Sequence, residues 1–389
     1  MERRKFLQLT ATGTGGWLVL PQFLSASNWL ANEENSSDQV LVFIQLNGGN
    51  DGLNTFIPYT DPLYYEHRPK IGISKNEVIQ AINGMGFHPA LKDLAKIAHD
   101  GNLTVIQNVG YPNPNRSHFR SQEIWQTASD SHQYLDHGWL GRFLDIQCTN
   151  ELVPSLNIDP IDNLALKAQK SNGLTVKDFQ KIKRYQTDGE ELKLSNNPQL
   201  DFVRKLQYAS TEGMEEIGKA LKKAAYFNES YANNPLAKNL EWMAKLIKGG
   251  LHSKVYYTSL NGFDTHNNQL QIHQKQLGIL NDAIYSFYND LKKNALLSRV
   301  TLVVFSEFGR RVKENGSGTD HGTAGPMLII GGNNKGKVIG SNPNLSQLQQ
   351  GDLVFETDFR SVYATLLQEK FQFSPASIQI KNEALKGVF

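Results

Sequence analysis

Carboxylate and imidazole side chains recur along the chain beside short apolar segments, most of them directly after one. The side chains in question are Asp51, Asp264, His266, Glu307, Asp320 and His321. Carboxylate oxygen and imidazole nitrogen together suit a divalent ion, and two such ions can hold the attacking and leaving oxygens of an in-line displacement. The pattern predicts a divalent-metal site, for which zinc, manganese, magnesium and calcium are the candidate ions.

The spacing of two pairs refines this prediction. Asp264 and His266 are two residues apart in Gly-Phe-Asp-Thr-His, so both side chains face the same side of an extended segment. Asp320 and His321 are adjacent and tend to point apart. We therefore expect Asp264 and His266 to bind the ion together, and only one of Asp320 and His321 to bind it directly while the other supports a ligand.

Asp51 and Glu307 complete the predicted ligand set, although each has a simpler alternative role. Asp51 stands in Gly-Gly-Asn-Asp-Gly, where it could shape a turn because Asn and Asp tolerate left-handed backbone. Glu307 could be a carboxylate at the start of a helix, paired with Arg310 or Arg311. Both alternatives stay open at this stage.

Ser117 and His118 follow the second apolar segment and open a predicted helix over 118–128. Serine is a preferred N-cap residue, so Ser117 could serve the helix alone. His118 is expected to pack against the site or to support a ligand rather than to bind the ion.

The elements that must position these residues alternate between apolar strands and amphipathic helices. The expected strands are 40–46, 103–106, 254–260, 300–305 and 327–330, and the expected helices are 89–99, 118–128 and 269–292. This alternation predicts an α/β fold with a doubly wound, mostly parallel sheet, in which ligands bind beyond the carboxyl ends of the strands. Residues 159–234 are rich in Lys, Gln and Asn and are expected to form a helical insertion or lid within a domain spanning 38–389.

The first 31 residues read as an export signal. Arg3 and Arg4 precede Phe-Leu and a weakly apolar stretch, which is the order of a twin-arginine signal peptide. The stretch is too short and interrupted for a stable membrane span. We therefore expect the twin-arginine export machinery as a partner and a periplasmic or cell-envelope location.

Charge and cysteine content limit which partners and which covalent crosslinks can be expected. Loss of residues 1–31 would remove three basic residues and one acidic residue from totals of 40 and 38, and would leave a formally neutral chain. Nothing in this balance predicts binding to nucleic acid. Cys148 is the single cysteine, so the fold must be stabilised by its core rather than by an intrachain disulfide.

The motifs taken together resemble a known family. They are Asn-Gly-Gly-Asn-Asp-Gly at 47–52, Arg-Ser-His-Phe at 116–119, Gly-Trp-Leu-Gly-Arg at 138–142, Phe-Asp-Thr-His at 263–266, Ser-Glu-Phe-Gly-Arg at 306–310 and Gly-Thr-Asp-His-Gly at 318–322. The set resembles a bacterial family of twin-arginine-exported proteins catalogued as a domain of unknown function. That family in turn resembles a distant branch of the alkaline phosphatase and sulfatase superfamily.

The resemblance implies an alkaline phosphatase-like core with a two-metal site at the strand ends. By position, Asp51 resembles a metal-binding aspartate, and Ser117 resembles the nucleophile that opens a helix. Asp264 with His266, and the later His321, resemble ligands of the first metal. The sequence also departs from the superfamily, which has Asp-His where this chain has Glu307-Phe308.

The resemblance favours a metal-dependent hydrolase of phosphate or sulfate esters, with a small-molecule or glycan ester as substrate. An ion would lower the pKa of Ser117 or of a bound water. Arg116, whose planar fork suits a tetrahedral oxyanion, would stabilise the developing charge. The alternative is a catalytically silent protein that keeps the fold for binding or assembly in the cell envelope.

The export hypothesis is tested by changing Arg3 and Arg4 together to lysine. The expected result is a folded precursor that keeps its signal and stays in the cytoplasm, because the paired arginines are the feature that the export route reads. Cell fractionation with an antibody against the chain measures this. Normal accumulation of the variant outside the cytoplasm would contradict the twin-arginine assignment.

Overall fold

A computed structural model of the protein describes residues 38–170, 173–177, 198–224 and 229–389. The predicted signal peptide and part of the predicted lid lie outside these residues. The described residues contain a nine-stranded central sheet in the order β11-β5-β10-β9-β1-β8-β6-β7, with β14 also paired to β5. The strands of this sheet are β1 (Val40–Asn47), β5 (Leu103–Gly110), β6 (Ser155–Asn157), β7 (Leu174–Thr175), β8 (Val255–Asn261), β9 (Val300–Ser306), β10 (Gly325–Gly331), β11 (Val338–Ile339) and β14 (Thr357–Asp358).

The strand β1 lies at the centre of this sheet because its side chains are apolar on both faces. Val42 and Ile44 belong to one buried cluster, and Leu41 and Phe43 belong to another on the opposite face. Successive side chains of a strand point to opposite faces, so a run of apolar residues needs cover on both sides. The described part of the sheet has that cover.

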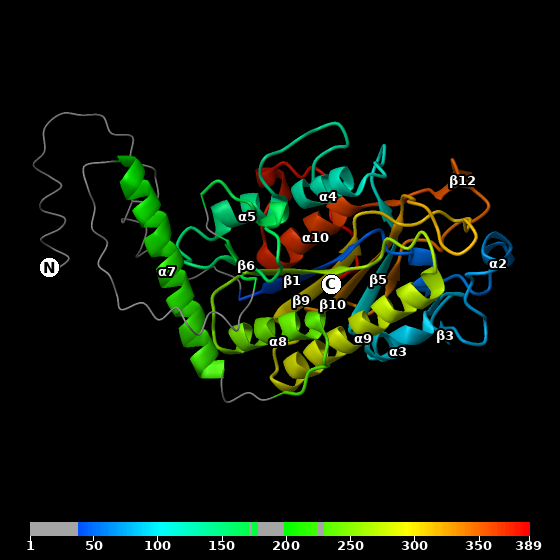
Figure 1. Ribbon diagram of the computed structural model, residues 1–389, viewed down its shortest axis with the longest axis horizontal. Helices are drawn as coiled ribbons and strands as arrows, with labels where there is room; N and C mark the ends of the chain where they lie inside the picture. Colours follow the sequence, from blue (N-terminus) through cyan, green and yellow to red (C-terminus); the bar gives the residue numbers. More distant parts are fainter. Residues whose placement is uncertain (1–37, 171–172, 178–197, 225–228) are drawn as a thin grey trace, which may run out of the picture. The chain divides into compact units, whose positions relative to one another are not determined.

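Helices supply the cover in two layers (Figure 1). Apolar residues of α3, α8 and α9 join the cluster of Val42, while those of α4, α5 and α10 join the cluster of Phe43. The helices are α2 (Pro62–His67), α3 (Lys92–His99), α4 (His118–Thr127), α5 (Trp139–Gln147), α7 (Pro198–Ala224), α8 (Pro235–Lys248), α9 (Gln269–Lys293) and α10 (Phe359–Phe371). The prediction of an α/β fold with a mostly parallel sheet is confirmed.

One strand of the central sheet runs against the others, and its direction matters for the site. β1 pairs in parallel with β8 and β9, whereas β10 pairs antiparallel with both β9 and β5. The carboxyl ends of β1, β5, β8 and β9 therefore meet at one edge of the sheet, and β10 begins at that same edge. A residue shortly before β10 consequently lies beside residues that follow the parallel strands.

Smaller elements complete the described chain. Two minor sheets are formed by β2 (Phe56–Ile57), β4 (Gly86–Phe87) and β3 (Ile79–Gln80), and by β12 (Leu348–Gln349) and β13 (Asp352–Leu353). Short 3-10 helices are η3 (Gly52–Asn54), η4 (Pro89–Leu91), η5 (Leu164–Leu166) and η6 (Pro375–Ile378). None of the helices in the described ranges is both long and apolar enough to cross a membrane.

The region predicted to be an insertion or lid contains both strand and helix. β7 adds an edge strand beside β6, and Val176, which follows β7, is buried against the core. Further along, α7 supplies a long helix within the expected helical insertion, and its Ile217 and Ala220 are also buried against the core. Whether the region acts as a lid stays a prediction.

The central position of β1 gives a test of the core. Ile44 is fully buried, so Ile44→Ala should lower the free energy of unfolding by about 2–5 kcal/mol through lost burial and a residual cavity. Ile146 on α5 is 52% exposed, and Ile146→Ala should change stability by less than about 0.5 kcal/mol. Denaturant titration measures both, and equal effects of the two changes would contradict this view of the core.

Candidate metal centre

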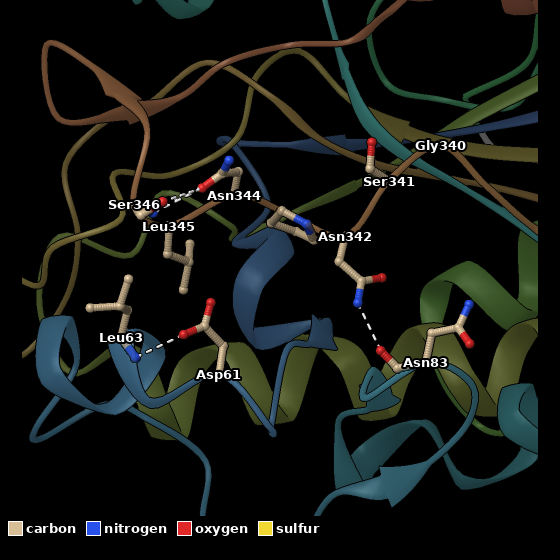
Figure 2. A pocket seen from close by; sticks show the side chains of 10 residues that line it. Asp61, Leu63, Asn83, Gly340, Ser341, Asn342, Asn344, Leu345 and Ser346 are labelled. Carbon is tan, nitrogen blue, oxygen red and sulfur yellow. Dashed lines mark hydrogen bonds between the residues drawn. The ribbon is translucent and has the colours of Figure 1, made fainter.

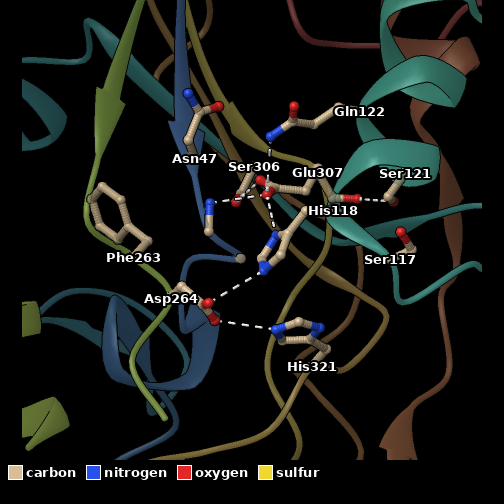
Figure 3. A network of polar contacts seen from close by, with 12 residues as sticks. Asn47, Ser117, His118, Ser121, Gln122, Phe263, Asp264, Ser306, Glu307 and His321 are labelled. Carbon is tan, nitrogen blue, oxygen red and sulfur yellow. Dashed lines mark hydrogen bonds and ion pairs between the residues drawn. The ribbon is translucent and has the colours of Figure 1, made fainter. Parts of the chain in front are cut away.

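Four side chains converge at the carboxyl edge of the sheet: His118, Asp264, His266 and His321. The Oδ1 atom of Asp264 lies 3.0 Å from Nε2 of His266 and 3.1 Å from Nε2 of His321. Its Oδ2 atom lies 3.4 Å from Nε2 of His118, and the Nε2 atoms of His266 and His321 are 3.0 Å apart. Figure 3 shows His118 and His321 pointing toward Asp264 from different segments. We call these four residues the His-Asp cluster.

Each member of the His-Asp cluster comes from a segment that leaves or approaches the sheet at this edge. His118 is the first residue of α4, in the connection after β5. Asp264 and His266 lie between β8 and α9. His321 lies ahead of the antiparallel strand β10 and forms a β-bridge with Arg310. The convergence therefore follows from the strand directions.

Each imidazole of the cluster is also held at its other ring nitrogen. Nδ1 of His118 is 2.9 Å from Oε1 of Glu307, and Nδ1 of His266 is 3.2 Å from Oδ1 of Asp320. Nδ1 of His321 is 2.8 Å from the main-chain oxygen of Arg116. Metal-binding histidines have this pattern, in which a carboxylate or carbonyl oxygen fixes the orientation of the ring.

A buried guanidinium holds the segments of the site together. Nη2 of Arg310 donates to Oδ1 of Asp264 at 2.6 Å and to the carbonyl oxygens of Phe263 and Gly48. Its Nε donates to the carbonyl of Gly49 and its Nη1 to that of Thr319. Arg310 thus joins the loops that follow β1, β8 and β9, and its side chain is fully buried.

Electrostatics favours the charged form of the central carboxylate. Burial alone would raise the pKa of Asp264, but hydrogen bonds with Arg310 and His321 and the charges of Arg310 and His118 lower it to about 2. The pKa of His118 is raised, chiefly because Glu307 accepts a hydrogen bond from its ring. An ionised carboxylate therefore lies among three imidazoles.

Two close approaches explain the residue types around the cluster. Gly48 has a φ of +117°, and a Cβ atom there would lie 2.3 Å from the backbone nitrogen of Asp264, so a side chain cannot be accommodated. The Gly48 amide donates to Oε1 of Glu307 at 2.9 Å. The buried ring of Phe308 packs beside the rings of His118 and His321, with centroids 5.0 and 4.8 Å away.

Asp51, predicted as a ligand, lies outside the His-Asp cluster. Its Oδ2 atom accepts hydrogen bonds from Nη1 of Arg68 at 2.6 Å and from the side-chain amide of Gln269. Burial would raise the pKa of Asp51, but the Arg68 charge and hydrogen bond lower it. Asp51 follows β1 at the expected edge, where Arg68 rather than an imidazole pairs with it.

Glu307, also predicted as a ligand, is buried behind His118. Its Oε1 atom contacts the His118 ring, the Gly48 amide and, at 3.4 Å, the side-chain amide of Gln122. Its Oε2 atom is 3.0 Å from the Ser306 hydroxyl. With these partners, Glu307 orients an imidazole rather than facing the centre of the cluster.

Ser117 and Arg116, predicted to be catalytic, flank the cluster in sequence. The Ser117 hydroxyl is exposed, makes no capping hydrogen bond and lies beyond His118 from Asp264 in Figure 3. The Arg116 guanidinium forms an ion pair with Asp352. Within the described residues, neither side chain is hydrogen-bonded to a member of the cluster.

Sequence reasoning missed two features of the site. His118 was expected to have a supporting role, yet its Nε2 atom lies 3.4 Å from Oδ2 of Asp264, and it forms with Asp264 and His321 a group that could hold a metal ion. The sequence did contain a signal for this role, because His118 follows the end of a strand and stands next to the serine that opens a helix. Arg310 was considered as an ion partner of Glu307, and no local pattern could show that it spans three loops instead.

A separate cavity of about 540 Å³ lies on the surface (Figure 2). Asp61, Leu63, Asn83 and the segment 340–346 line it. None of the residues predicted from sequence to form the site is among them, so the cavity carries no part of the proposed chemistry.

The Arg310 contacts give a test of how the site is held. Arg310→Gln should lower the free energy of unfolding by about 3–5 kcal/mol. The change removes a buried cation and leaves the carbonyl oxygens that it bonds without a hydrogen-bond donor. Arg299→Gln is the matched control, since Arg299 pairs with the exposed Asp38 and should cost less than about 1 kcal/mol. Denaturant titration measures the free energy of unfolding of both variants. A small effect of Arg310→Gln would show that the loops of the site keep their positions without this side chain.

Comparison with solved structures found similarity at low identity. The C-terminal periplasmic domain of EcEptC from Escherichia coli, in complex with Zn, has 13% identity and a TM-score of 0.37, with 77% of this chain and 74% of that chain covered. A protein in the alkaline phosphatase superfamily from Vibrio parahaemolyticus has 10% identity and a TM-score of 0.38, covering 87% and 67%. The lipoteichoic acid synthase LtaP from Listeria monocytogenes has 9% identity and a TM-score of 0.35, covering 82% and 74%.

No match was found among curated proteins. A family model does match residues 104–369, which is well over half of the chain and spans five of the six motifs in full. The resemblance stated from the motifs is thereby confirmed at the level of the family. The chain belongs to the family described as protein of unknown function (DUF1501).

Proposed function

We propose that this chain is an exported, metal-dependent hydrolase of phosphate or sulfate esters, in which the His-Asp cluster holds one divalent ion. The observation that carries the proposal is the arrangement of the imidazole nitrogens. The carbonyl oxygen of Arg116 can only accept, so Nδ1 of His321 carries its hydrogen and Nε2 of the neutral ring carries a lone pair. The carboxylates of Glu307 and Asp320 favour the same tautomer for His118 and His266.

Oδ1 of Asp264 and Nε2 of His266 and of His321 then lie 3.0–3.1 Å from one another, and Nε2 of His118 lies 3.4 Å from Oδ2 of Asp264. Such a group is mutually repulsive unless a cation or protons lie among its members. Tetrahedral zinc with bonds of about 2.0–2.1 Å separates its ligand atoms by about 3.3 Å. This separation is close to the 3.0–3.1 Å between the ligand atoms of Asp264, His266 and His321. The residues present therefore fit a divalent ion.

The donor types favour zinc or a similar transition metal over magnesium or calcium. Three imidazole nitrogens and one carboxylate oxygen suit zinc, whereas magnesium and calcium take oxygen ligands. Asp51 and Glu307 are engaged by Arg68 and His118 respectively, so the geometry supports one ion more readily than two.

When bound, the ion would supply Lewis acidity and would lower the pKa of water or of a substrate hydroxyl. The chain's own residues would position it: Glu307, Asp320 and the Arg116 carbonyl hold the imidazoles, and Arg310 holds Asp264. The Asp264 side chain is 48% exposed, which leaves the cluster open to a substrate. Ser117 remains the predicted nucleophile, and water is the alternative.

A second candidate function has support from one observation. Structural zinc sites take all four ligands from the protein, whereas catalytic sites keep an open position, and the His-Asp cluster offers four candidate ligands. The Ser117 hydroxyl is also not in contact with the cluster. A metal-binding protein of the cell envelope without turnover is therefore the alternative proposal.

Metal binding tests both proposals at once. Zinc should raise the thermal stability of the purified protein by RT ln(1 + [L]/Kd), about 2.7 kcal/mol at a hundredfold excess over Kd, and calcium should not. Asp264→Asn combined with His321→Ala should lose most of this gain because two ligands are removed. His99→Ala, at an exposed histidine, is the matched control and should keep it.

Turnover separates the two candidates. Ser117→Ala should keep the zinc-induced stabilisation and should abolish hydrolysis of aryl phosphates or sulfates if Ser117 is the nucleophile. Retained hydrolysis would assign that role to water. Zinc binding without hydrolysis of any such ester would favour the metal-binding protein, and a wild-type protein that binds no metal would contradict both.

A further inference from the structure

The formal charges around the His-Asp cluster limit the charge of a substrate that it can receive. Asp264, Glu307 and Asp320 contact the imidazoles. Of the described lysines and arginines, Arg310 alone has a side chain hydrogen-bonded to a cluster member. Three carboxylates and one guanidinium leave two negative charges in excess, which a single divalent ion cancels.

Arg310 cannot also serve as the receptor for a substrate anion. Its side chain is fully buried, and each of its three nitrogens already donates to a carbonyl of the surrounding loops. Nη2 additionally donates to Asp264. The charge of Arg310 therefore compensates groups of the protein itself and is not offered to a substrate.

The next cations are Arg116 and Arg311, which share one carboxylate. Asp352 forms an ion pair with Arg116, and its Oδ1 lies 3.8 Å from Nε of Arg311. The Asp352 side chain is 1% exposed, whereas those of Arg116 and Arg311 are 35% and 31% exposed. Two guanidinium groups on one carboxylate leave a single net positive charge at the surface.

This pair of arginines is tied to the cluster through the main chain. The Arg116 carbonyl is 2.8 Å from Nδ1 of His321. The Arg311 amide donates to the carbonyl of Asp320 at 3.0 Å. The main chains of both arginines are thus anchored to the segments that carry His321 and Asp320.

We infer that the site prefers esters whose reacting group carries one negative charge, namely phosphodiesters or sulfate monoesters, over phosphate monoesters, which are dianions. This inference rests on the proposed function. A monoanion matches the single surplus positive charge of the ion-loaded site. A dianion adds one uncompensated negative charge beside Asp264 and Asp320, whose side chains are both half-exposed.

The test compares zinc-loaded wild type with Asp352→Asn, using bis(para-nitrophenyl) phosphate, para-nitrophenyl sulfate and para-nitrophenyl phosphate at a pH where the last is a dianion. Asp352→Asn adds one positive charge to the arginine pair. The ratio of kcat/KM for the monoester to that for the diester should rise by about tenfold. Asp61→Asn removes the same charge at the separate cavity, away from the cluster, and should leave the ratio unchanged.

Two further measurements show whether an effect of Asp352→Asn comes from its charge or from loss of the folded structure. Arg311→Gln removes positive charge and should change the ratio in the opposite direction. Calorimetry with methyl phosphate and dimethyl phosphate, without turnover, should show that Asp352→Asn strengthens binding of the dianion more than that of the monoanion. The zinc content of each variant is checked alongside.

The outcomes distinguish this inference from the function on which it rests. Hydrolysis in which neither Asp352→Asn nor Arg311→Gln changes the ratio, or in which wild type prefers the phosphate monoester, would overturn the charge preference alone. Zinc-loaded protein that hydrolyses none of the three esters would overturn the proposed function and this inference with it.

Discussion

The guanidinium of Arg310 is the interaction on which the geometry of this site depends. Its hydrogen bonds run to the loop after β1, the loop after β8 and the segment before β10, and one of them holds Asp264 in place. A buried cation is costly unless it is paired and fully hydrogen-bonded. Here five acceptors meet that requirement. The loops that carry these acceptors therefore cannot separate without exposing the charge or leaving it without hydrogen-bond partners.

Folding and the assembly of the His-Asp cluster are therefore linked. The loop that carries Asp264 lies against Gly48, and Arg310 donates to carbonyls of both segments. Gly48 also donates to Glu307, which in turn orients His118. A change at any of these positions reaches the imidazoles through two contacts at most.

Much of the fold was predictable from sequence, because apolar runs such as 40–46 and 300–305 are long and rich in β-branched residues. The placing of His321 beside Asp264 depended on β10 being antiparallel, which no local pattern of 327–330 reveals. The short strands β6 and β7 were missed, since a few residues at a sheet edge carry little periodicity. The candidate site was anticipated as a region at the strand ends, and Asp264, His266 and His321 do lie together there.

The partners of the individual carboxylates could not be predicted, because each depends on contacts far apart in the chain. Asp51 and Asp264 both follow a strand and a glycine, and both were expected to bind metal. Asp51 is 17 residues from its partner Arg68, and that arginine also donates to carbonyls of Arg311 and Val312. Sequence patterns report where a carboxylate leaves the sheet but not which cation reaches it.

The two carboxylates thus illustrate two ways of compensating negative charge at the edge of one sheet. Asp51 is fully buried, and a guanidinium pairs with its Oδ2 atom and compensates its charge. Asp264 is half-exposed and has a guanidinium on one oxygen and imidazoles on both. Imidazoles can accept a proton or a metal ion, so the charge at Asp264 can respond to what binds there. That difference, rather than the number of carboxylates, is the reason for proposing the metal site at Asp264 and not at Asp51.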